Sequence, residues 1–330
     1  MAATIKDIAK KANVSYGTVS RALNNKYGVK KETRERVIAV AVKMGYSPNG
    51  IARGLVQKAT YSIGLVVPDI LNPFYPGVAR GIEDKALKGG YSVFFCNTNH
   101  DKKREIQSLK LLAEKRVDGI ILAPGLEDST IPDSLANGDI PIVHICRRYV
   151  EPSKSFVVID DERGGFLATK HLIEQGYKKI GFIGAKDQAL YLDERFEGYK
   201  QAFQKFGLQI DQRYIYSSDF QRQTGYRIVR KMLAHGDYPR AIFAENDILA
   251  LGVIQAIREA GLSIPGDIAV VGFDDIPFAS FPEVQLTTIA QPKNEMGEIA
   301  VSILLDQMSG RNTEPRKVIL EPQLIVRKSS

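Results

Sequence analysis

TIKDIAKKANVSYGTVSRALNN, residues 4–25, decides how the first part of the chain folds. Its apolar residues recur at helical spacing in two short groups, one over 5–12 and one over 16–24. The segment 13–15 between them is too short to let two helices run antiparallel, so the helices must cross at a steep angle. This arrangement is a helix-turn-helix, whose second helix enters a DNA major groove.

Capping residues and charge agree with this interpretation. Thr4 followed by Asp7 predicts an N-cap with an acidic first turn, and Ser15 is placed to cap the second helix. Residues 1–60 carry twelve Lys and Arg against three Asp and Glu, whereas the rest of the chain carries 33 against 35. The excess positive charge therefore lies on the segment with the motif, as a phosphate-binding surface requires.

Composition limits the remaining possibilities. With 330 residues, 44% hydrophobic and 25% charged, the chain can bury an ordinary core. It has no apolar run of the roughly 18 residues that a membrane span needs, and its N-terminus lacks the apolar region of a signal peptide. Cys96 and Cys146 have neither metal-ligand nor redox spacing, and both are expected to be buried, reduced thiols. We expect a cytoplasmic protein without a metal or cofactor.

A third helix is predicted over 31–44, with Gly45 as its C-terminal stop. Ser47-Pro48 then begins a segment, 49–57, that resembles a short helix but contains Gly50 and Gly54. Such a segment is too short to be a stable isolated helix in water. Two interpretations stay open: a flexible linker, or a short helix that needs contacts outside itself to become ordered.

From residue 61 onward, short apolar runs alternate with segments of helical length. Continuous apolar runs of this kind indicate parallel strands that are buried on both faces. Two sets of such units predict two doubly wound α/β lobes. The predicted strands are 63–67, 92–96, 119–123, 142–145, 180–183, 241–244 and 269–272.

Several longer blocks carry a resemblance to the lactose-repressor (LacI/GalR) family of bacterial transcription regulators. The segment 4–24 and GYSPNGIARGL at 45–55 are similar to its DNA-binding part. The body contributes SIGLVVPDILNPFY at 62–75, RFEGYKQAF at 195–203, ENDILALG at 245–252, VVGFDD at 270–275 and LTTIAQP at 286–292. The resemblance covers essentially the whole chain in the expected order, and these blocks are specific.

The resemblance implies a helix-turn-helix head over 1–47, a hinge helix over 48–60 and an effector-binding and dimerisation domain over 61–330. That domain is expected to have the type I periplasmic-binding-protein fold. Its N-lobe is expected over 61–160 and 292–321, and its C-lobe over 161–291 and 322–330. The expected partners are a pseudo-palindromic double-stranded DNA operator, a second copy of the chain and a small effector, with no membrane.

On the DNA side, the resemblance assigns the second helix to the major groove. Arg21 is a candidate for reading guanine, with a phosphate contact as an equal alternative. Gly17 departs from relatives that place a reading side chain there, and Leu55 is expected to wedge between base steps in the minor groove. The DNA-binding candidates are Thr4, Ser15, Tyr16, Gly17, Thr18, Ser20, Arg21, Asn24, Asn49, Ala52 and Leu55.

On the effector side, the resemblance points to polar and aromatic residues at strand ends. Aromatic faces, an Arg fork, a carboxylate and amides suit a sugar ring, because each hydroxyl needs a donor and an acceptor. The less favoured alternatives are core packing for Phe74 and Tyr75 and a simple helix cap for Asn246. The effector-binding candidates are Asn72, Phe74, Tyr75, Arg147, Arg195, Asn246, Asp274 and Gln291.

The resulting expectation is a homodimeric repressor, controlled by a small effector that closes the cleft between the lobes. A sugar is the first expectation. Cys146, at the position of an aspartate ligand in some relatives, keeps a sugar phosphate open together with Arg147 and Arg148. A purine corepressor or a phosphocarrier protein partner also stays open. An enzyme is not expected, because metal-ligand spacing, a P-loop and a G-x-S-x-G elbow are absent from the sequence.

Overall fold

The computed structural model describes residues 3–24, 27–46, 59–124, 131, 135, 140–149, 151–184 and 190–330. They divide into two compact units, 1–60 and 61–330. Each unit has its own hydrophobic core. We call residues 1–60 the head and residues 61–330 the body.

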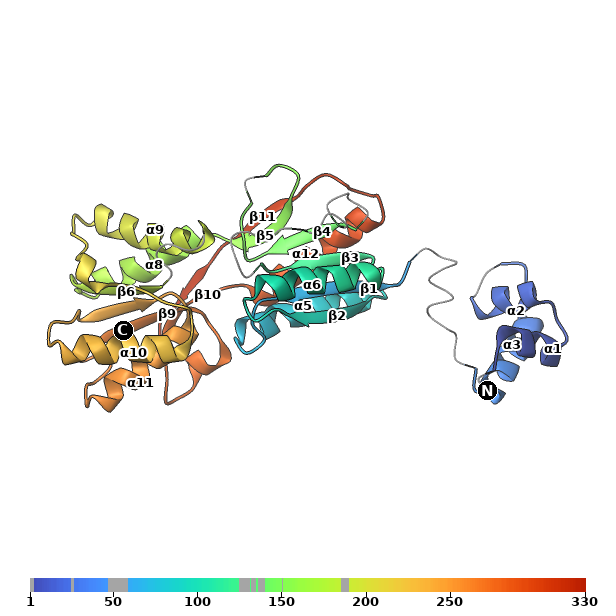
Figure 1. Ribbon diagram of the computed structural model, residues 1–330, viewed down its shortest axis with the longest axis horizontal. Helices are drawn as coiled ribbons and strands as arrows, with labels where there is room; N and C mark the ends of the chain where they lie inside the picture. Colours follow the sequence, from blue (N-terminus) through green and yellow to red (C-terminus); the bar gives the residue numbers. More distant parts are fainter. Residues whose placement is uncertain are drawn as a thin grey trace. The chain divides into compact units, whose positions relative to one another are not determined.

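The head is a small bundle of short helices, α1 (Ile5–Ala12), α2 (Tyr16–Leu23) and α3 (Lys31–Lys43) (Figure 1). Thr4 and Asp7 form a reciprocal capping box at the start of α1, which confirms the predicted N-cap. The core of the bundle is formed by the apolar positions that gave the helical spacing, namely Ile8, Ala12, Val19, Ala22, Val37 and Ala41.

The first lobe of the body is built on a six-stranded sheet in the order β11-β5-β4-β3-β1-β2, and every pair in it is parallel. Helices α5 (Phe74–Lys88) and α12 (Lys293–Met308) pack together on one face, and α6 (Lys102–Glu114) covers the other. Its strands are β1 (Ser62–Val67), β2 (Ser92–Asn97), β3 (Gly119–Leu122), β4 (Ile142–Ile145), β5 (Ser155–Ile159) and β11 (Lys317–Leu320).

The second lobe repeats the plan with a sheet in the order β12-β10-β9-β8-β6-β7. Its strands are β6 (Ile180–Gly184), β7 (Ile215–Ser217), β8 (Ala241–Ala244), β9 (Ala269–Asp274), β10 (Thr287–Ala290) and β12 (Gln323–Ile325). One face carries α8 (Asp161–Glu174) and α9 (Leu190–Lys205), and the other carries α10 (Arg222–Ala234) and α11 (Asp247–Glu259). Short 3-10 turns lie at η1 (Gln212–Tyr214) and η2 (Pro277–Ser280).

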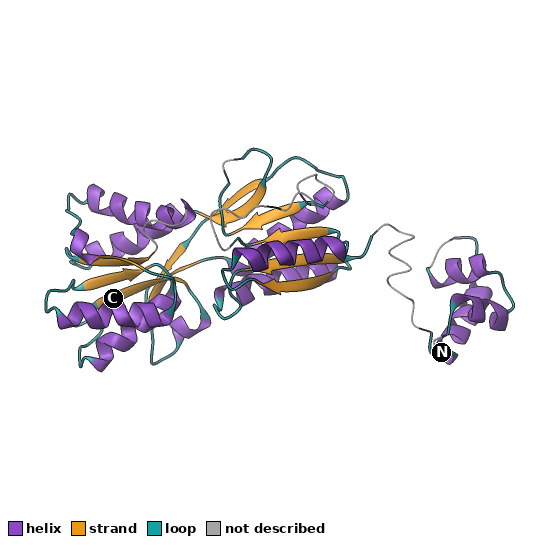
Figure 2. Ribbon diagram, in the orientation of Figure 1, coloured by secondary structure: helices purple, strands orange, loops and turns teal. Residues whose placement is uncertain are grey.

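In both lobes, helices lie on the two faces of a central sheet (Figure 2), which confirms the predicted doubly wound α/β architecture. Strand β12 is the exception to the parallel pairing, because it runs antiparallel to β10 at the edge of the second sheet. An antiparallel edge strand is common in sheets of this size.

The chain passes between the lobes at three points, after β5, between β10 and α12, and between β11 and β12. Because parallel strands end at the same edge of their sheet, the segments that follow β1 and β9 belong to the ends where open α/β sheets bind ligands. None of the described helices combines the length and the apolar character needed to cross a membrane.

Candidate functional site

The second helix of the head presents one apolar and one polar face. Val19 and Ala22 are buried against α1 and α3, whereas Arg21 is exposed and 57% of Tyr16 is accessible. Ser15 caps α2, since its Oγ accepts a hydrogen bond from the backbone N of Thr18 at 3.1 Å. The exposed side chains at the N-terminal end of α2 are thus placed on a helix whose start is fixed by its cap.

The other DNA-binding candidates of the head differ in their surroundings and hydrogen bonds. Gly17 has open space around it, because a Cβ built there would meet only Ser15 Oγ at 3.8 Å. The Asn24 Nδ2 donates to the backbone O of Ser20, so this side chain closes the end of α2. The candidates Asn49, Ala52 and Leu55 lie outside the described residues.

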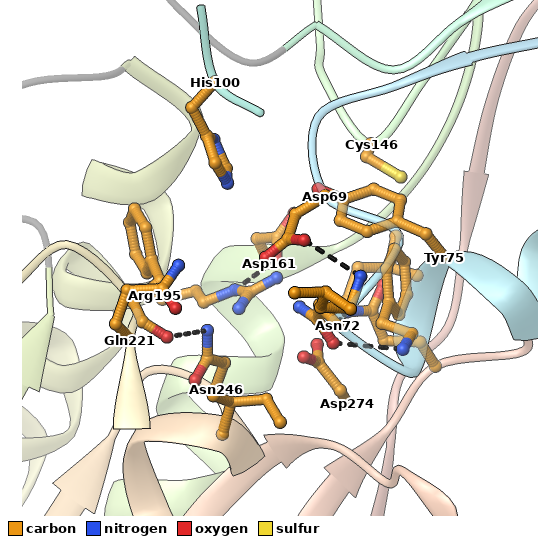
Figure 3. Close-up of a pocket in the computed structure, with 16 residues that line it drawn as sticks. Asp69, Asn72, Tyr75, His100, Cys146, Asp161, Arg195, Gln221, Asn246 and Asp274 are labelled. Carbon is orange, nitrogen blue, oxygen red and sulfur yellow. Dashed lines mark hydrogen bonds and ion pairs between the residues drawn. The ribbon is translucent and has the colours of Figure 1, made fainter. Parts of the chain in front are cut away.

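Asn72, Phe74 and Tyr75 form the first wall of a cavity of about 110 Å³ in the body (Figure 3). Asn72 lies in the turn after β1, where its Oδ1 accepts a hydrogen bond from Phe74 N at 3.0 Å and thereby starts α5. Phe74 and Tyr75 follow in the first turn, with their rings edge to face and their centroids 5.1 Å apart. The turn after β1 therefore supplies an amide and aromatic surface to the cavity.

Arg195 is the cation of the cavity, and it is held by three contacts. Its Nε donates to Asp161 Oδ1 at 2.7 Å, and its Nη1 donates to the backbone O of Glu245 at 2.7 Å. Its guanidinium carbon lies 3.7 Å from the centroid of the Phe273 ring. The remaining terminal nitrogen, Nη2, has no hydrogen-bond partner in the part of the chain that the structure describes. A fixed fork with one open donor is suited to recognising a ligand oxygen.

The electrostatics of this cation follow from its neighbours. Burial lowers the pKa of Arg195, but the combined effect of Asp161, Asp274 and Glu245 raises it above its ordinary value, so the guanidinium stays charged. Burial also raises the pKa of Asp161, and the charge of Arg195 counteracts part of that shift. The pair is therefore an anchored ion pair on the cavity wall.

Asp274 lies at the end of β9 and is 3% exposed. Its Oδ1 accepts a hydrogen bond from Gln291 Nε2 at 2.7 Å, so the two candidates are fixed against each other. Burial raises the pKa of Asp274 to about 6, although Arg195 and Lys293 act in the opposite direction. The backbone at Asp274 has a φ of 113°, an unusual value for a residue with a side chain.

Asn246 is both a helix cap and a cavity residue. Its Oδ1 accepts a hydrogen bond from Leu249 N at 2.7 Å at the start of α11, as the alternative interpretation predicted. It also lines the cavity. Its Nδ2 donates one hydrogen bond to the O of Phe220 at 3.5 Å, which leaves the second N–H of the amide for a ligand.

The cavity brings together seven of the eight predicted residues, and only Arg147 is not among those that line it. The Arg147 guanidinium carbon lies instead 5.2 Å from the ring centroid of Tyr149, and the side chain is buried. Its neighbour Arg148 forms an ion pair with Glu194 at 3.3 Å. The complete lining is Asp69, Leu71, Asn72, Phe74, Tyr75, His100, Cys146, Ile159, Asp161, Arg195, Phe220, Gln221, Asn246, Ile248, Asp274 and Gln291.

The expectation of two buried thiols is wrong in degree. Cys96 and Cys146 are both free but only partly buried. Cys96 lies on β2, an edge strand that pairs on one side only, with β1. Cys146 lies just after β4 and lines the cavity, where burial raises its thiol pKa. Neither cysteine belongs to a metal-ligand cluster within the described ranges.

The sequence interpretation missed several lining residues, of which Asp69 and Asp161 matter most. Asp69 is within the block that carries the resemblance, two residues after β1, and its Oδ1 accepts from Leu71 N at 2.9 Å. Asp161 is the first residue of α8, directly after a lobe crossing. Together with Asp274 they place three carboxylates against the single guanidinium of Arg195, so the lining is acidic.

Comparison with known proteins finds relatives over the whole chain. Residues 4–49 match the family described as bacterial regulatory proteins, lacI family, and residues 169–330 match a periplasmic binding protein-like domain. The chain is 36% identical to the HTH-type transcriptional repressor PurR of Aliivibrio salmonicida (strain LFI1238) over 328 residues, covering 99% of this chain and 98% of the repressor.

Two solved structures are similar over the fold. The lac repressor dimer, bound to operator and the anti-inducer ONPF, has a TM-score of 0.90 at 27% identity and is matched over 100% of this chain and 99% of that one. A LacI family transcriptional regulator from Enterococcus faecium with bound ribose has a TM-score of 0.74 at 32% identity, over 82% of this chain and 98% of that one. The chain therefore belongs to the lacI family of bacterial regulatory proteins, and it is a DNA-binding transcriptional repressor that an effector controls.

Proposed function

We propose that the effector is a neutral sugar, bound in the acidic cavity between the two lobes. The observation that carries this proposal is the composition of the lining, which combines aromatic surface with carboxylates, amides and one fixed guanidinium. Sugar rings have apolar C–H faces that stack on aromatic rings and hydroxyls that both donate and accept. The Enterococcus faecium relative with bound ribose adds independent support.

Each kind of group has a role in this proposal. Phe74 and Tyr75 offer their rings to a face of the sugar. Arg195 Nη2 donates to a ring or hydroxyl oxygen, and Asp274 accepts from two neighbouring hydroxyls. The amides of Asn72 and Gln291 complete the set, because an amide can pair with a hydroxyl in either direction.

The same charges argue against a phosphorylated sugar. At an effective dielectric constant of 20, two like unit charges 6 Å apart repel by about 3 kcal/mol. A phosphate beside Asp69 and Asp274 would meet this repulsion, and Arg195 is already paired with Asp161. Arg147, which the sequence offered as a phosphate partner, does not line the cavity.

On the DNA side, we propose that residues 1–47 read the operator, 48–60 form the hinge and 61–330 bind the effector and dimerise. Support comes from the lac repressor dimer on its operator, to which the whole chain is similar. Two-fold symmetry of the dimer then requires a pseudo-palindromic operator. Because the protein acts on DNA, the expected place of action is the cytoplasm.

Calorimetry on the full chain tests the effector assignment. The panel contains D-ribose, D-glucose, D-galactose, ribose 5-phosphate and adenine. A ligand that binds only the native state raises the melting temperature. We expect a neutral sugar to do so, Arg195→Met to abolish the shift, and the exposed Arg213→Met, as matched control, to leave it unchanged.

Other outcomes of the panel would redirect the proposal. A shift with ribose 5-phosphate alone would contradict the argument from the acidic lining. A shift with adenine alone would assign a purine corepressor. A folded protein that responds to no member of the panel would favour control by a phosphocarrier protein.

DNA selected from a random library tests the operator assignment. We expect the selected sequences to be pseudo-palindromic. We further expect Leu55→Ala to weaken binding to them far more than binding to random duplex, because a wedge acts only at its cognate step. Equal loss on both DNAs would contradict the proposed role of Leu55.

A further inference from the structure

The turn that carries Asp274 has an unusual backbone. Asp274 has a φ of 113° and Asp275 has a φ of 49°, so two successive residues with side chains lie in the region that favours glycine. Such conformations persist only where surrounding contacts fix them, and they concentrate at ligand-binding and switching segments. The contacts that fix this turn therefore control where the Asp274 carboxylate lies.

The second lobe holds the turn from one side. Arg327 Nη2 contacts Asp275 Oδ1 at 2.7 Å. The next amide, Ile276 N, donates to Asp247 Oδ2 at 2.8 Å, and Asp247 is completely buried. These contacts come from the same lobe as the turn, so they fix its position within that lobe.

The first lobe contributes one cation to the same turn. Lys293 is the first residue of α12, and its Nζ donates to the backbone O of Asp274 at 2.5 Å and of Asp275 at 2.9 Å. Helix α12 packs against α5, β3, β4 and β5, all of which belong to the first lobe. The ammonium of Lys293 therefore joins the two lobes at the residue that forms part of the cavity wall.

The stem of Lys293 also contacts α5, the helix whose first two residues line the cavity. A Cβ built on Gly77 of α5 would lie 2.9 Å from Lys293 Cδ, so the lysine chain lies directly against α5 at this glycine. Helix α5 begins at Phe74, and both Phe74 and Tyr75 line the cavity. Lys293 is thus in contact with elements that carry both walls.

We propose that Lys293 is a positioning residue that couples the effector cavity to the movement of one lobe against the other. A molecule that binds Asp274 shifts the two carbonyls at the end of β9, and the lysine transmits this shift to α12 and α5. Conversely, a change in the lobe angle moves the Asp274 carboxylate. The proposal rests on the proposed function, because it takes the cavity to be the effector site. Coupling between the cavity and DNA is then reciprocal.

The test uses Lys293→Met, Lys293→Arg and the exposed Lys200→Met as matched control. Methionine keeps an unbranched stem over Gly77 and removes the ammonium, whereas arginine keeps a cation. The first measurement is hydrogen exchange on the full chain without ligand. We expect the amides of 274–276 to exchange at least about tenfold faster in Lys293→Met, with α11 amides unchanged, and near wild-type rates in the other two variants.

The second measurement is the affinity for D-ribose in the absence and presence of DNA selected for binding. We expect Lys293→Met to keep the DNA-free affinity within about threefold of wild type. In Lys293→Met, the ratio of ribose affinity with DNA to ribose affinity without DNA should move at least about fivefold toward one. In Lys293→Arg, this ratio should return to the wild-type value. Coupling energies between sites correspond to ratios of about 5 to 150, so the loss is measurable.

Three results would overturn the proposal: unchanged exchange at 274–276 in Lys293→Met, an unchanged ratio of affinities, or no recovery in Lys293→Arg. The last would indicate packing alone. If wild-type protein binds none of the neutral sugars of the panel, the sugar assignment fails instead. Hydrogen exchange of the 274–276 amides is then sufficient to test the lysine contact, because it compares Lys293→Met with Lys293→Arg and needs no ligand.

Discussion

Replacing Asp274 by asparagine should stabilise the folded protein while it weakens effector binding. The carboxylate is 3% exposed, and burial is the largest cause of its raised pKa. Asparagine has the same shape and keeps an oxygen that accepts from Gln291 Nε2. It removes the buried negative charge, whose retention at neutral pH costs folding free energy.

The size of the effect follows from the shift of the pKa. A change from 3.8 to about 6 corresponds to roughly 3 kcal/mol, since one pKa unit is about 1.4 kcal/mol. The raised pKa means that the folded state favours the protonated acid. This contribution to stability is fully present below pH 3.8 and is lost as the pH rises through 6. The advantage of Asp274→Asn should therefore be complete above pH 7 and vanish near pH 4.

Urea unfolding followed by circular dichroism at pH 7.5, 6 and 4.5 measures this difference, because the two proteins differ at residue 274 alone. Asp211→Asn is the matched control. Hydrogen bonds from Arg213 lower the pKa of Asp211, so its replacement should bring no gain. Ribose binding should weaken by about ten- to a hundredfold in Asp274→Asn, as expected for a hydrogen bond to a charged group. Equal or lower stability at pH 7.5 would refute the assignment of a buried, costly carboxylate.

Three further substitutions test the packing and the DNA-reading face. Gly165→Ala should destabilise the body by about 3 kcal/mol in thermal unfolding, because its Cβ would lie 2.1 Å from the Arg195 carbonyl oxygen; unchanged stability would contradict the packing of α8 on α9. Gly17→Ala, with open space around it, should stabilise the head by about 0.5–1 kcal/mol; a loss would show a hidden contact. Arg21→Ala should weaken operator binding about 10- to 100-fold in fluorescence anisotropy, and equal loss on random duplex would identify a phosphate contact instead.

The sequence predicted the head and the central strands well because their signals are local. The two helices of residues 4–25 and the run 63–67 contain their apolar pattern within one element. Five strands were not predicted, among them β5, which is buried at every position; two of the others have weak patterns. β11 is partly exposed and begins with Lys317, and β7 has only three residues. The antiparallel pairing of β12 depends on a lobe crossing, which no local pattern reveals.

The candidate site was predictable where motif blocks end at strand ends, as for Asn72, Asp274 and Gln291. It was not predictable where the decisive contact is between distant segments. Asp161 reaches the cavity because it pairs with Arg195, 34 positions further along the chain. Arg147 was proposed from its charge and its place beside Cys146, but its position after β4 turns it toward Tyr149 instead. The charge of a residue can be read from the sequence, whereas the direction of its side chain depends on the tertiary fold.

The decisive measurement for control by a sugar effector is operator affinity with and without a bound sugar. DNA selected for binding to the full chain is titrated by fluorescence anisotropy, at one fixed salt concentration, with and without a saturating neutral sugar that calorimetry has identified. We expect at least about a fivefold change in operator affinity in wild type, and the same factor in sugar affinity when DNA is present. We also expect Arg195→Met to bind DNA without responding to the sugar. If the protein binds both the operator and a sugar but the sugar leaves operator affinity unchanged, control by a sugar effector is contradicted.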